Sequence, residues 1–512
     1  MKRNIPFAVI EFGSTAIRLA IAENQGRGEL RIIENLQQAV LVGRDSFHTD
    51  FISEETTTEC IKAVRNFFET LKEYGILKKN ITVVATTAIK TASNREQFMD
   101  RIYISTGLLI NILDDADICR FSYRAVKPVL EKEVFFKKEN TITLEVGGGS
   151  TDCVYFENGR VTSSHVYEQG SYRVNSKAKA TEKYGSEEYQ EVVQNLIGPT
   201  INKIKSIVDL THKANLVALG SEMRFVAHLL NPKQTNTSIV KVTTSEFISV
   251  VKELAKNSVD KIAKKYSLSY ENAESLLPTL MIYLELINTF KMKYFFVLEG
   301  SLRSGILQEV ISTKSWTNEF KRQVYNSAMV LSKKYGVNSR FVSTVSKYSY
   351  SMLAFLSKHF EFFEEDEILL NMAAILHGTG QFISMTQDHK HAMYIIENSD
   401  LFGISSKNKT LIALIARYYC GALPSSMHEE FVLLDRINKI RVSKLAAILR
   451  ITRVMSLLTN SYQKHSYKIK EDVFQIIFEK SLDIAMIQSK LINASSLFSN
   501  IYGLKVTIIA KN

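Results

Sequence analysis

The sequence predicts an α/β protein with two related lobes, followed by a mostly α-helical module. Up to about residue 311, short apolar segments typical of buried strands alternate with helical patterns. Two of these segments carry an acid and then break into a Gly/Ser/Thr turn. After about residue 312, long helical periodicities dominate, with one short strand expected at Leu504 to Ile509. We therefore predict a first lobe at 1–125, a second lobe at 126–311 and the helical module at 312–512.

The first lobe begins with an apolar segment, Ala8 to Phe12, that contains Glu11 and ends in the turn Gly13-Ser14-Thr15. A strand-like segment with Arg18 follows the turn. Taken alone, a Ser/Thr turn either binds phosphate or simply caps and reverses the chain. The other elements expected here are strands at Leu30 to Glu34 and Ile81 to Thr86, a helix opened by Ser53, and a helix ending near Ser105.

The second lobe repeats this arrangement around three consecutive glycines. A strand from about Asn140 contains Glu145 and leads into Gly147, Gly148, Gly149, Ser150, Thr151 and Asp152. Glycine tolerates positive φ and has no Cβ, so backbone N–H groups of such a turn can converge on a phosphate. Three glycines in a row are costly in entropy, which favours phosphate contact over a plain tight turn. Further strands are expected at Cys153 to Phe156, Ala214 to Ala218 and Phe295 to Leu298.

The acids that precede the two turns suggest a metal. Magnesium prefers oxygen ligands and keeps several waters, so Glu11 and Glu145 can hold a hydrated Mg²⁺ or orient a water. The alternative is that each carboxylate caps its own turn. Two acid-bearing phosphate turns together predict a phosphate-handling cleft between the lobes.

Composition narrows the class of protein. The net charge of +11 favours an anionic partner, either nucleic acid or a smaller polyanion, although the scattered Lys and Arg also fit an ordinary solvated surface. The four cysteines are far apart in sequence, which fits reduced thiols better than a disulfide or a zinc site. Neither a signal-peptide pattern nor a long uncharged apolar stretch is present, so we expect a cytoplasmic protein that does not span a membrane.

The two turns and several other segments, in the same order, resemble the exopolyphosphatase / guanosine pentaphosphate phosphohydrolase (Ppx/GppA) family of the actin-like ATPase superfamily. The resemblance covers essentially the full length. In the lobes it includes Val84 to Lys90 with Asn94, Arg120 with Tyr123 and Val126, Gly170 with Arg173, Leu219 to Ser221, and Glu299 to Gly305. In the helical module it includes Ala373 to His377, His389 to His391, Asn398 to Leu401, Ala416 to Tyr418, and Gly421 to Pro424.

The resemblance implies two ribonuclease-H-like lobes around a cleft, then a helical domain related to HD-type phosphohydrolases. It implies Mg²⁺-dependent release of orthophosphate from polyphosphate ends, or of the terminal phosphate of pppGpp. The expected partners are therefore inorganic polyphosphate or guanosine penta- or tetraphosphate, not nucleic acid or membrane, and a homodimer is an open alternative because relatives commonly dimerise. The phosphate-binding residues implied are Ser14, Thr15, Arg18, Lys90, Gly147, Gly148, Gly149, Ser150 and Thr151.

The chain differs from the family at three acidic positions. The family has aspartate where this chain has Glu11 and Glu145, and glutamate where it has Asp152. Each exchange keeps the charge but moves the carboxylate by one methylene, and a shift of about 1 Å can cost about a hundredfold in rate. We expect Glu11, Glu145 and Asp152 to form one rearranged metal site. Lys90 replaces a phosphate-gripping arginine, which keeps the charge and loses the bidentate geometry.

The catalytic base is the most serious departure. The family's base is the second glutamate of a Glu-Glu-Ala-Arg motif, and alignment on Arg120 puts Ile118 at that position and Asp117 before it. Isoleucine cannot accept a proton, so either Asp117 or Asp115 takes the role, or the chemistry is slow or absent. Asp117, Glu145 and Asp152 are the catalytic residues we predict.

The helical module lacks an intact HD metal motif. Gly378 follows His377 where metal-binding relatives have aspartate, and Arg453 stands where the final acid would be. We therefore expect His377, His389 and His391 to be structural or anion-facing. A basic stretch is either a solvated face or a channel wall that guides polyphosphate, and it comprises Arg436, Lys439, Arg441, Lys444, Arg450 and Arg453.

Three functions remain open. The first is a Mg²⁺-dependent exopolyphosphatase or pppGpp phosphatase. The second is a catalytically impaired regulatory protein that binds polyphosphate or (p)ppGpp, because Ile118 replaces the base. The third is an actin-like ATP-dependent module, for which Glu222 beside Gly220-Ser221 gives no clear support.

Overall fold

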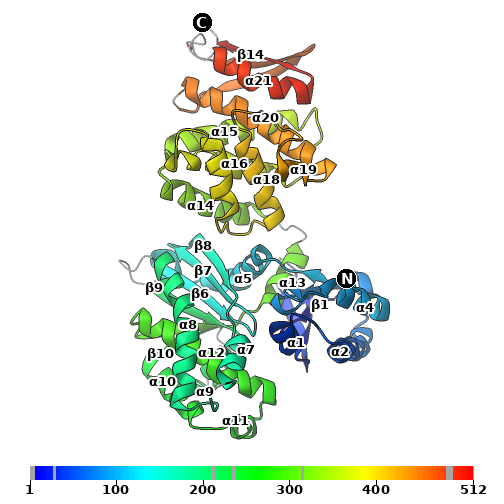
Figure 1. Cartoon of the computed structure of the whole chain (residues 1–512), viewed down its shortest axis with the longest axis vertical. Coiled ribbons are helices and arrows are strands. Elements are labelled where there is room, and N and C mark those ends of the chain that lie inside the picture. The colour runs from blue at the N-terminus through cyan, green and yellow to red at the C-terminus, as the bar shows by residue number, and fades with distance from the viewer. Residues whose placement is uncertain are drawn as a thin grey trace. The chain divides into compact units, whose positions relative to one another are not determined.

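The chain folds into two compact units, Met1–Thr317 and Asn318–Asn512, and each is described by itself. The computed structural model describes residues 6–26, 30–180, 182–208, 214–232, 238–312, 316–459, 461–479, 482 and 488–510. Figure 1 labels the elements of both units along the chain. The first unit holds both predicted lobes, and it ends close to the predicted boundary between 311 and 312.

The first lobe is built on a five-stranded sheet of order β3-β2-β1-β4-β5. Its central strand β1 pairs antiparallel with β2 and parallel with β4. The strands are β1 (Phe7–Phe12), β2 (Ala16–Asn24), β3 (Leu30–Ala39), β4 (Ile81–Ala85) and β5 (Asn111–Ile112). Helices α1 (Val42–Thr49), α2 (Glu54–Glu73), α3 (Thr87–Lys90) and α4 (Arg95–Thr106) belong to the same lobe, with a 3₁₀ turn at Lys78–Asn80.

The second lobe is built on a six-stranded sheet of order β10-β11-β9-β6-β7-β8. Its strands are β6 (Asn140–Val146), β7 (Thr151–Glu157), β8 (Arg160–Tyr167), β9 (Ala214–Leu219), β10 (Ile239–Thr243) and β11 (Tyr294–Leu298). Its helices are α6 (Val134–Lys138), α7 (Ser171–Lys179), α8 (Glu187–Ile207), α9 (Ser221–Leu230), α10 (Thr244–Ala255), α11 (Val259–Tyr266) and α12 (Tyr270–Thr289).

The two sheets share one topology. In each, a hairpin-linked antiparallel trio (β1-β2-β3 or β6-β7-β8) is extended by two parallel strands on the far side of its first strand, and the second sheet adds β10 as an antiparallel edge strand. Strands β1 and β6 are therefore equivalent, and so are the turns that follow them. The prediction of two related α/β lobes is confirmed, and the equivalence places both acid-bearing strands at the centre of their sheets.

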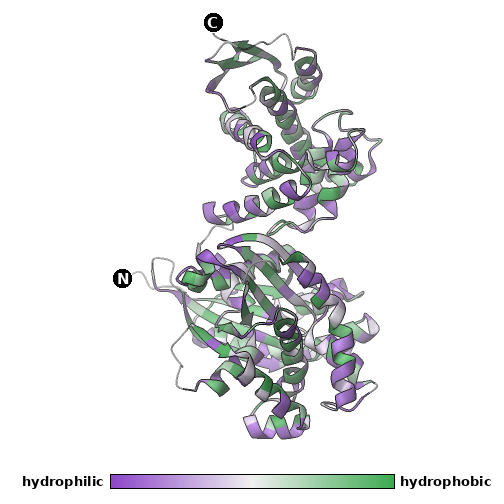
Figure 2. Ribbon diagram, turned by 90° about the vertical axis from the view of Figure 1, so that its left-hand side faces the viewer, coloured by the Kyte–Doolittle hydropathy of each residue, from purple (hydrophilic) through white to green (hydrophobic). Residues whose placement is uncertain are grey.

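Buried apolar side chains hold each lobe together. One cluster joins β1 and β2 to α2 and α4, and another joins β6 and β9 to α8 and α12. Figure 2 shows hydrophobic residues along the central strands and hydrophilic residues along outer helices of this unit. Helix α2 illustrates the local cause: Ser53 caps it by accepting from the Thr56 N–H, and Cys60, Val64, Phe67 and Leu71 form its buried stripe.

Each sheet is followed by a helix that packs against the sheet of the other lobe. Helix α5 (Asp115–Leu130) follows the first sheet but contacts β7 and β8 of the second. Helix α13 (Leu302–Ser312) follows the second sheet but contacts β1 and β2 of the first. The predicted boundary at 125 therefore falls inside α5. The two helices meet at Gly305, where an added Cβ would lie 2.0 Å from the Phe121 carbonyl oxygen.

We expect Gly305→Ala to destabilise the first unit by about 1–3 kcal/mol, because the methyl group meets backbone atoms of α5 that cannot rotate away. Urea unfolding followed by circular dichroism measures this. Ser249→Ala at an exposed position inside helix α10 is the control: it also introduces alanine into a helix, and this change should be neutral or stabilise by up to about 0.5 kcal/mol. Equal stability of the two variants would contradict the close contact between α5 and α13.

The second unit is mostly helical, as predicted, but ends in a small sheet of order β12-β13-β14. Only the last strand, β14 (Lys505–Ala510), overlaps the strand expected from the sequence; β12 (His465–Lys470) and β13 (Val473–Phe478) were not predicted. The helices are α14 (Asn318–Lys334), α15 (Ser339–Leu356), α16 (Asp366–Leu376), α17 (Asp388–Glu397), α18 (Ser406–Arg417), α19 (Glu429–Val432), α20 (Arg436–Thr459) and α21 (Gln488–Tyr502), with a 3₁₀ turn at Thr379–Phe382. Among the described residues, no helix is both long and apolar enough to span a bilayer.

The basic stretch on α20 does not form one cationic face. Arg441 is buried and donates to Asp366 at 2.7 Å, and the buried Arg450 donates to the carbonyl oxygens of Tyr418, Gly421 and Ala422. These guanidinium groups are therefore occupied by the fold of the second unit. His377 is also buried; its Nδ1 lies 2.9 Å from the Ala374 carbonyl oxygen, and burial followed by the Arg453 charge lowers its pKa to about 4.

Candidate active site

The predicted phosphate turns line one cavity of about 120 Å³ between the two lobes of the first unit. The β1–β2 turn and the β6–β7 turn contribute Ser14, Thr15 and the three consecutive glycines. Other walls come from the end of β4, the start of α9 and the start of α13, through Thr86, Thr87, Gly220, Ser221 and Arg303. The cavity therefore lies at the carboxyl ends of β1, β4, β6, β9 and β11, where ligands usually bind in α/β folds.

The two turns have the same hairpin geometry. The N–H of Gly13 donates to the Ala16 carbonyl at 3.0 Å, and the N–H of Gly147 donates to the Ser150 carbonyl at 2.8 Å. Each turn thus closes on its first glycine and leaves the following residues at the tip. In each hairpin the acid stands two positions before that glycine, as Glu11 and Glu145.

The tips of the two turns face each other. A Cβ on Gly148 would lie 3.1 Å from the Ser14 Cβ, and one on Gly149 would lie 2.6 Å from Phe47 and 3.1 Å from the Ser14 Oγ. The Thr87 hydroxyl also lies 3.4 Å from the Ser150 hydroxyl. None of the three glycines has positive φ, so the sequence argument needs correcting. These glycines are required for close approach between the lobes, not for left-handed backbone.

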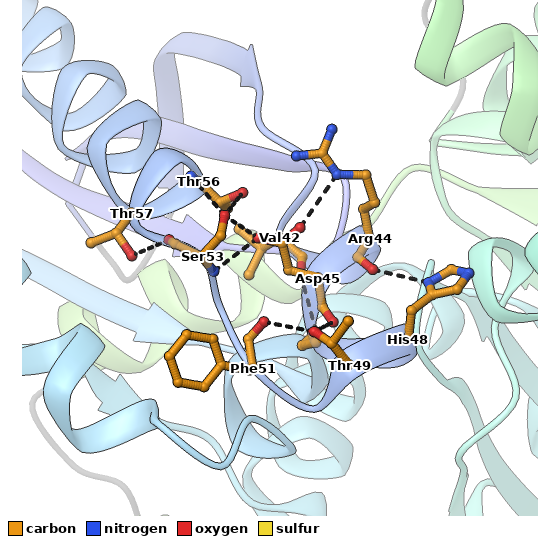
Figure 3. A network of polar contacts seen from close by, with 10 residues as sticks. Val42, Arg44, Asp45, His48, Thr49, Phe51, Ser53, Thr56 and Thr57 are labelled. Atoms are coloured by element: carbon orange, nitrogen blue, oxygen red, sulfur yellow. Dashed lines mark hydrogen bonds and ion pairs between the residues drawn. The ribbon is translucent and has the colours of Figure 1, made fainter.

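Helix α1 supports the first turn. The N–H of Gly43 donates to the Ser14 carbonyl at 2.7 Å, and a Cβ on Gly43 would lie 3.0 Å from the Ser14 Cβ. Asp45 ties α1 to the start of α2 by accepting from the Ser53 N–H at 2.9 Å and its hydroxyl at 2.6 Å (Figure 3). This network fixes α1, whose Phe47 ring packs under the Arg173 guanidinium of the second lobe at 4.2 Å.

Glu145 and Asp152 form a pair of acids on one wall of the cavity. They are opposite each other in the β6–β7 register, so their side chains lie on the same face of the sheet. Burial, followed by the charge of Glu11, raises the pKa of Glu145 to about 7. Burial, followed by the charge of Glu145, raises the pKa of Asp152 well above its usual value. The charges of Arg224 and Arg303 offset these effects on Glu145 only in part, so without a metal the protonated form is favoured in this pair.

Glu11 is in the opposite electrostatic state. Burial alone would raise its pKa, but the guanidinium groups of Arg303 at 2.5 Å and Arg18 at 3.8 Å hold the pKa below its usual value. Arg18 stands opposite Glu11 in the β1–β2 register, where the second hairpin has Asp152 opposite Glu145. The two equivalent hairpins therefore differ in charge.

The fit of a magnesium ion differs among the three predicted ligands. The Oδ1 atom of Asp152 is buried and has no hydrogen-bond partner, and Glu145 lies beside it with a raised pKa. An orphaned carboxylate oxygen next to a second acid is the donor set that Mg²⁺ prefers. Glu145 and Asp152 therefore fit the ion. Glu11 is already paired with two guanidinium groups and fits only if Arg303 moves.

The residue at the position of the family's base lies in the cavity wall, and it is Ile118. Asp117 does not line the cavity. Its Oδ2 accepts from the Asp114 N–H in the capping box of α5, and its Oδ1 accepts from Arg120 at 2.7 Å. Burial raises the pKa of Asp117, and the opposing effect of the Arg120 charge does not cancel this rise. Both its oxygens are thus committed to the start of α5.

Two predicted phosphate-binding side chains also lie outside the cavity wall. Lys90 pairs with Asp115 at 2.6 Å, and the Thr151 hydroxyl donates to the Gln169 carbonyl at 2.5 Å. The other predicted residues, Ser14, Thr15, Arg18, Gly147, Gly148, Gly149 and Ser150, all line the cavity.

Sequence reasoning missed two cations in the wall. Arg224 lies one helical turn after Gly220, at the start of α9, and its Nη1 donates to the Gly300 carbonyl at 3.0 Å. Arg303 lies at the start of α13. Both follow a strand-to-turn junction at the cavity edge, and a search for basic residues within four positions of each junction finds them.

Comparison with known proteins agrees with this geometry. The model of the Ppx/GppA phosphatase family matches residues 20–314, and that of Ppx/GppA phosphatase, domain III, matches residues 325–494. A guanosine-5'-triphosphate,3'-diphosphate pyrophosphatase of Pseudoalteromonas translucida is 21% identical over 92% of this chain and 92% of its own length.

Two further similarities are narrower. A bifunctional 3-dehydroquinate synthase/phosphatase of Fusobacterium nucleatum is 25% identical over 34% of this chain, which spans only 27% of that protein. The solved exopolyphosphatase of Cytophaga hutchinsonii matches with a TM-score of 0.55 and 15% identity, over 61% of this chain and 100% of that one, which shows the shared fold. Because the two family models cover most of the sequence, the chain belongs to the Ppx/GppA phosphatase family.

Proposed function

We propose that this protein hydrolyses phosphoanhydride bonds, releasing orthophosphate from polyphosphate ends or the terminal phosphate of pppGpp, with Mg²⁺ as cofactor. The observation that carries the proposal is one cavity lined by two equivalent turns. Hydroxyls of those turns, a pair of acids, and guanidinium groups from neighbouring elements all lie in its wall. Phosphoryl transfer depends mainly on positioning and charge neutralisation, and this cavity supplies groups for both.

Each wall has its own role in this proposal. The tips of the two turns, with Ser14 and Ser150, bind phosphate oxygens by hydrogen bonds. Arg18, Arg224 and Arg303 place positive charge around the same volume. Glu145 and Asp152 would hold the ion, which supplies further neutralisation of the phosphate when bound.

A binding protein of low activity is the second candidate, and the side chain of Ile118 in the cavity wall favours it. A base from this position contributes about 10²–10⁴-fold in typical enzymes, and isoleucine contributes none. Asp117 cannot replace it in the observed geometry, because both its oxygens are engaged. The binding groups do not depend on that base, so affinity for the polyanion would survive.

Paired assays distinguish the candidates. We expect saturable binding of long-chain polyphosphate or pppGpp in the presence of Mg²⁺, together with orthophosphate release that EDTA abolishes. Binding without release would support the regulatory candidate. Arg224→Gln should weaken binding of either ligand, whereas Lys252→Gln on the outer helix α10 is the control. Absence of binding to both polyanions would contradict the proposal.

A further inference from the structure

A cluster of three different potential metal ligands lies in the second unit, outside the cavity already described. The first turn of α17 supplies Asp388 and His389, and the turn after α18 supplies Cys420. One ligand atom from each lies within 4.8 Å of the other two, and all three residues are half-buried. Within the described ranges, no other group of three His, Cys, Asp or Glu residues meets this criterion.

Neighbouring residues hold the carboxylate of Asp388 in a fixed orientation. Its Oδ2 accepts from the Tyr419 hydroxyl at 2.5 Å and from Gln381 at 3.3 Å. Its Oδ1 instead lies 3.7 Å from Nδ1 of His389. One oxygen is thus anchored by outer partners while the other faces the imidazole, which is the arrangement that orients carboxylate ligands in metal sites.

The turn that carries Cys420 brings it to the imidazole. Gly421 has φ of +67°, a left-handed conformation that glycine adopts without strain. A Cβ on Gly421 would lie 3.4 Å from Cε1 and 3.5 Å from Nε2 of His389, so the ring packs directly against this turn. Tyr419, which anchors Asp388, immediately precedes Cys420 in the same turn.

We propose that Asp388, His389 and Cys420 bind a divalent transition-metal ion of the zinc class. One sulfur, one nitrogen and one oxygen ligand suit Zn²⁺ or Co²⁺, and three protein ligands leave a fourth tetrahedral position open. Metal–ligand bonds of about 2.0–2.3 Å put tetrahedral ligand atoms roughly 3.3–3.8 Å apart, so the cluster closes by about 1 Å on binding. The thiolate and carboxylate balance the charge of the ion.

The site is accessible and lies beside His377, because the Tyr419 ring that anchors Asp388 packs 4.9 Å from the His377 ring. Cys420 lines a cavity of about 500 Å³, which gives an ion a route to the sulfur. His377, where the sequence suggested a degenerate HD motif, is not one of the three ligands, and its Nδ1 lies 2.9 Å from the Ala374 carbonyl oxygen. The sequence argument against zinc rested on the separation of the cysteines, and this site needs only one of them.

Cobalt titration of the full-length protein tests the proposal. We expect tetrahedral visible bands and a near-ultraviolet sulfur-to-cobalt charge-transfer band that saturate at one Co²⁺ per chain in excess Mg²⁺, which occupies the acids of the first unit, and that Zn²⁺ removes. Cys420→Ser should abolish the charge-transfer band, and His389→Ala should weaken binding by at least about tenfold. Tyr419→Phe, which removes the anchor of Asp388, should weaken binding by roughly tenfold while the charge-transfer band remains.

Matched controls make the outcome decisive. His391→Ala changes a partly buried histidine on the same helix, and Cys60→Ser changes a buried cysteine of the first unit; neither should alter the spectrum. If Cys420→Ser fails to fold, His389→Gln and Tyr419→Phe still decide. No saturable Co²⁺ binding, or a charge-transfer band that persists without Cys420, would overturn the proposal. The proposed magnesium ligands of the first unit, Glu145 and Asp152, are carboxylates and cannot give a sulfur-to-cobalt band. This test is therefore independent of the proposed phosphatase activity.

Discussion

Glu145→Gln is expected to reduce Mg²⁺-dependent phosphate release by about a hundredfold or more, since it removes one of two acids that fit the ion in the cavity. The amide keeps the shape of the side chain and loses its charge. Steady-state orthophosphate release from polyphosphate and pppGpp measures the loss. Glu157→Gln, at the exposed end of β7, is the matched control and should leave the rate unchanged. An unchanged rate in Glu145→Gln would show that Glu145 takes no part in the reaction.

The same variant has an expected effect on stability that does not require turnover. The folded-state pKa of Glu145 is about 7, above its unfolded value of 4.5, so the folded protein binds the proton more tightly. Wild-type stability should therefore fall as pH rises from about 4.5 through 7. Glu145→Gln has no proton to lose there, and should exceed wild type by on the order of 2 kcal/mol above pH 7 without metal.

Thermal unfolding at pH 5 and pH 8, with and without Mg²⁺, measures this second effect. We expect the variant and wild type to be similar at pH 5, and the variant to melt higher at pH 8 in EDTA. Added Mg²⁺ should raise the melting temperature of wild type more than that of the variant. If Mg²⁺ stabilises both proteins equally, the ion does not bind at Glu145.

Ile118→Glu is expected to raise turnover by about a hundredfold, because it places a carboxylate in the cavity wall at the position of the family's base. The side chain of Ile118 is 3% exposed, so the introduced acid should lower stability while its surroundings raise its pKa. Single-turnover phosphate release and the pH dependence of kcat measure the gain. Ile118→Gln, which matches the size without a base, is the control.

Asp117→Asn is the complementary test of the neighbouring acid. It removes the charge that Arg120 contacts and weakens the capping box of α5, so we expect a loss of about 1 kcal/mol in stability. Turnover should not change, because Asp117 does not line the cavity. A loss of turnover as large as that of Glu145→Gln, with stability unchanged, would instead assign the base to Asp117.

The sequence was sufficient for the parts of the site that are local. A glycine turn after a buried strand is determined by adjacent residues, so the sequence could assign Ser14, Glu145 and the three glycines to one cleft, and all of them line the cavity. Their roles stay predictions. The two-lobe fold followed from alternation of strands and helices, a pattern that is also local. Strands β12 and β13 were missed because their alternation occurs in a region dominated by helical periodicity.

Side-chain pairings between distant elements could not be predicted in this way. Lys90 was expected to bind phosphate, but it forms an ion pair with Asp115 of another helix. Arg441 and Arg450 were expected on a basic surface, yet Asp366 and three carbonyl oxygens hold them inside the second unit. The ion pair of Arg303 with Glu11 could not be predicted, because the two residues are 292 positions apart.

The unequal charge of the two hairpins has a consequence for how a substrate enters. Arg18 and Arg303 attract a bare polyanion to the metal-free cleft, whereas negative charge on Glu145 and Asp152, which their raised pKa values already disfavour, would repel it. A magnesium-complexed phosphate chain avoids that repulsion, because the ion it carries meets those two acids while its own oxygens meet the guanidinium groups. Under the proposed function, the lobe with the balanced hairpin would bind the chain, and the lobe with the two acids would bind it best together with its counterion.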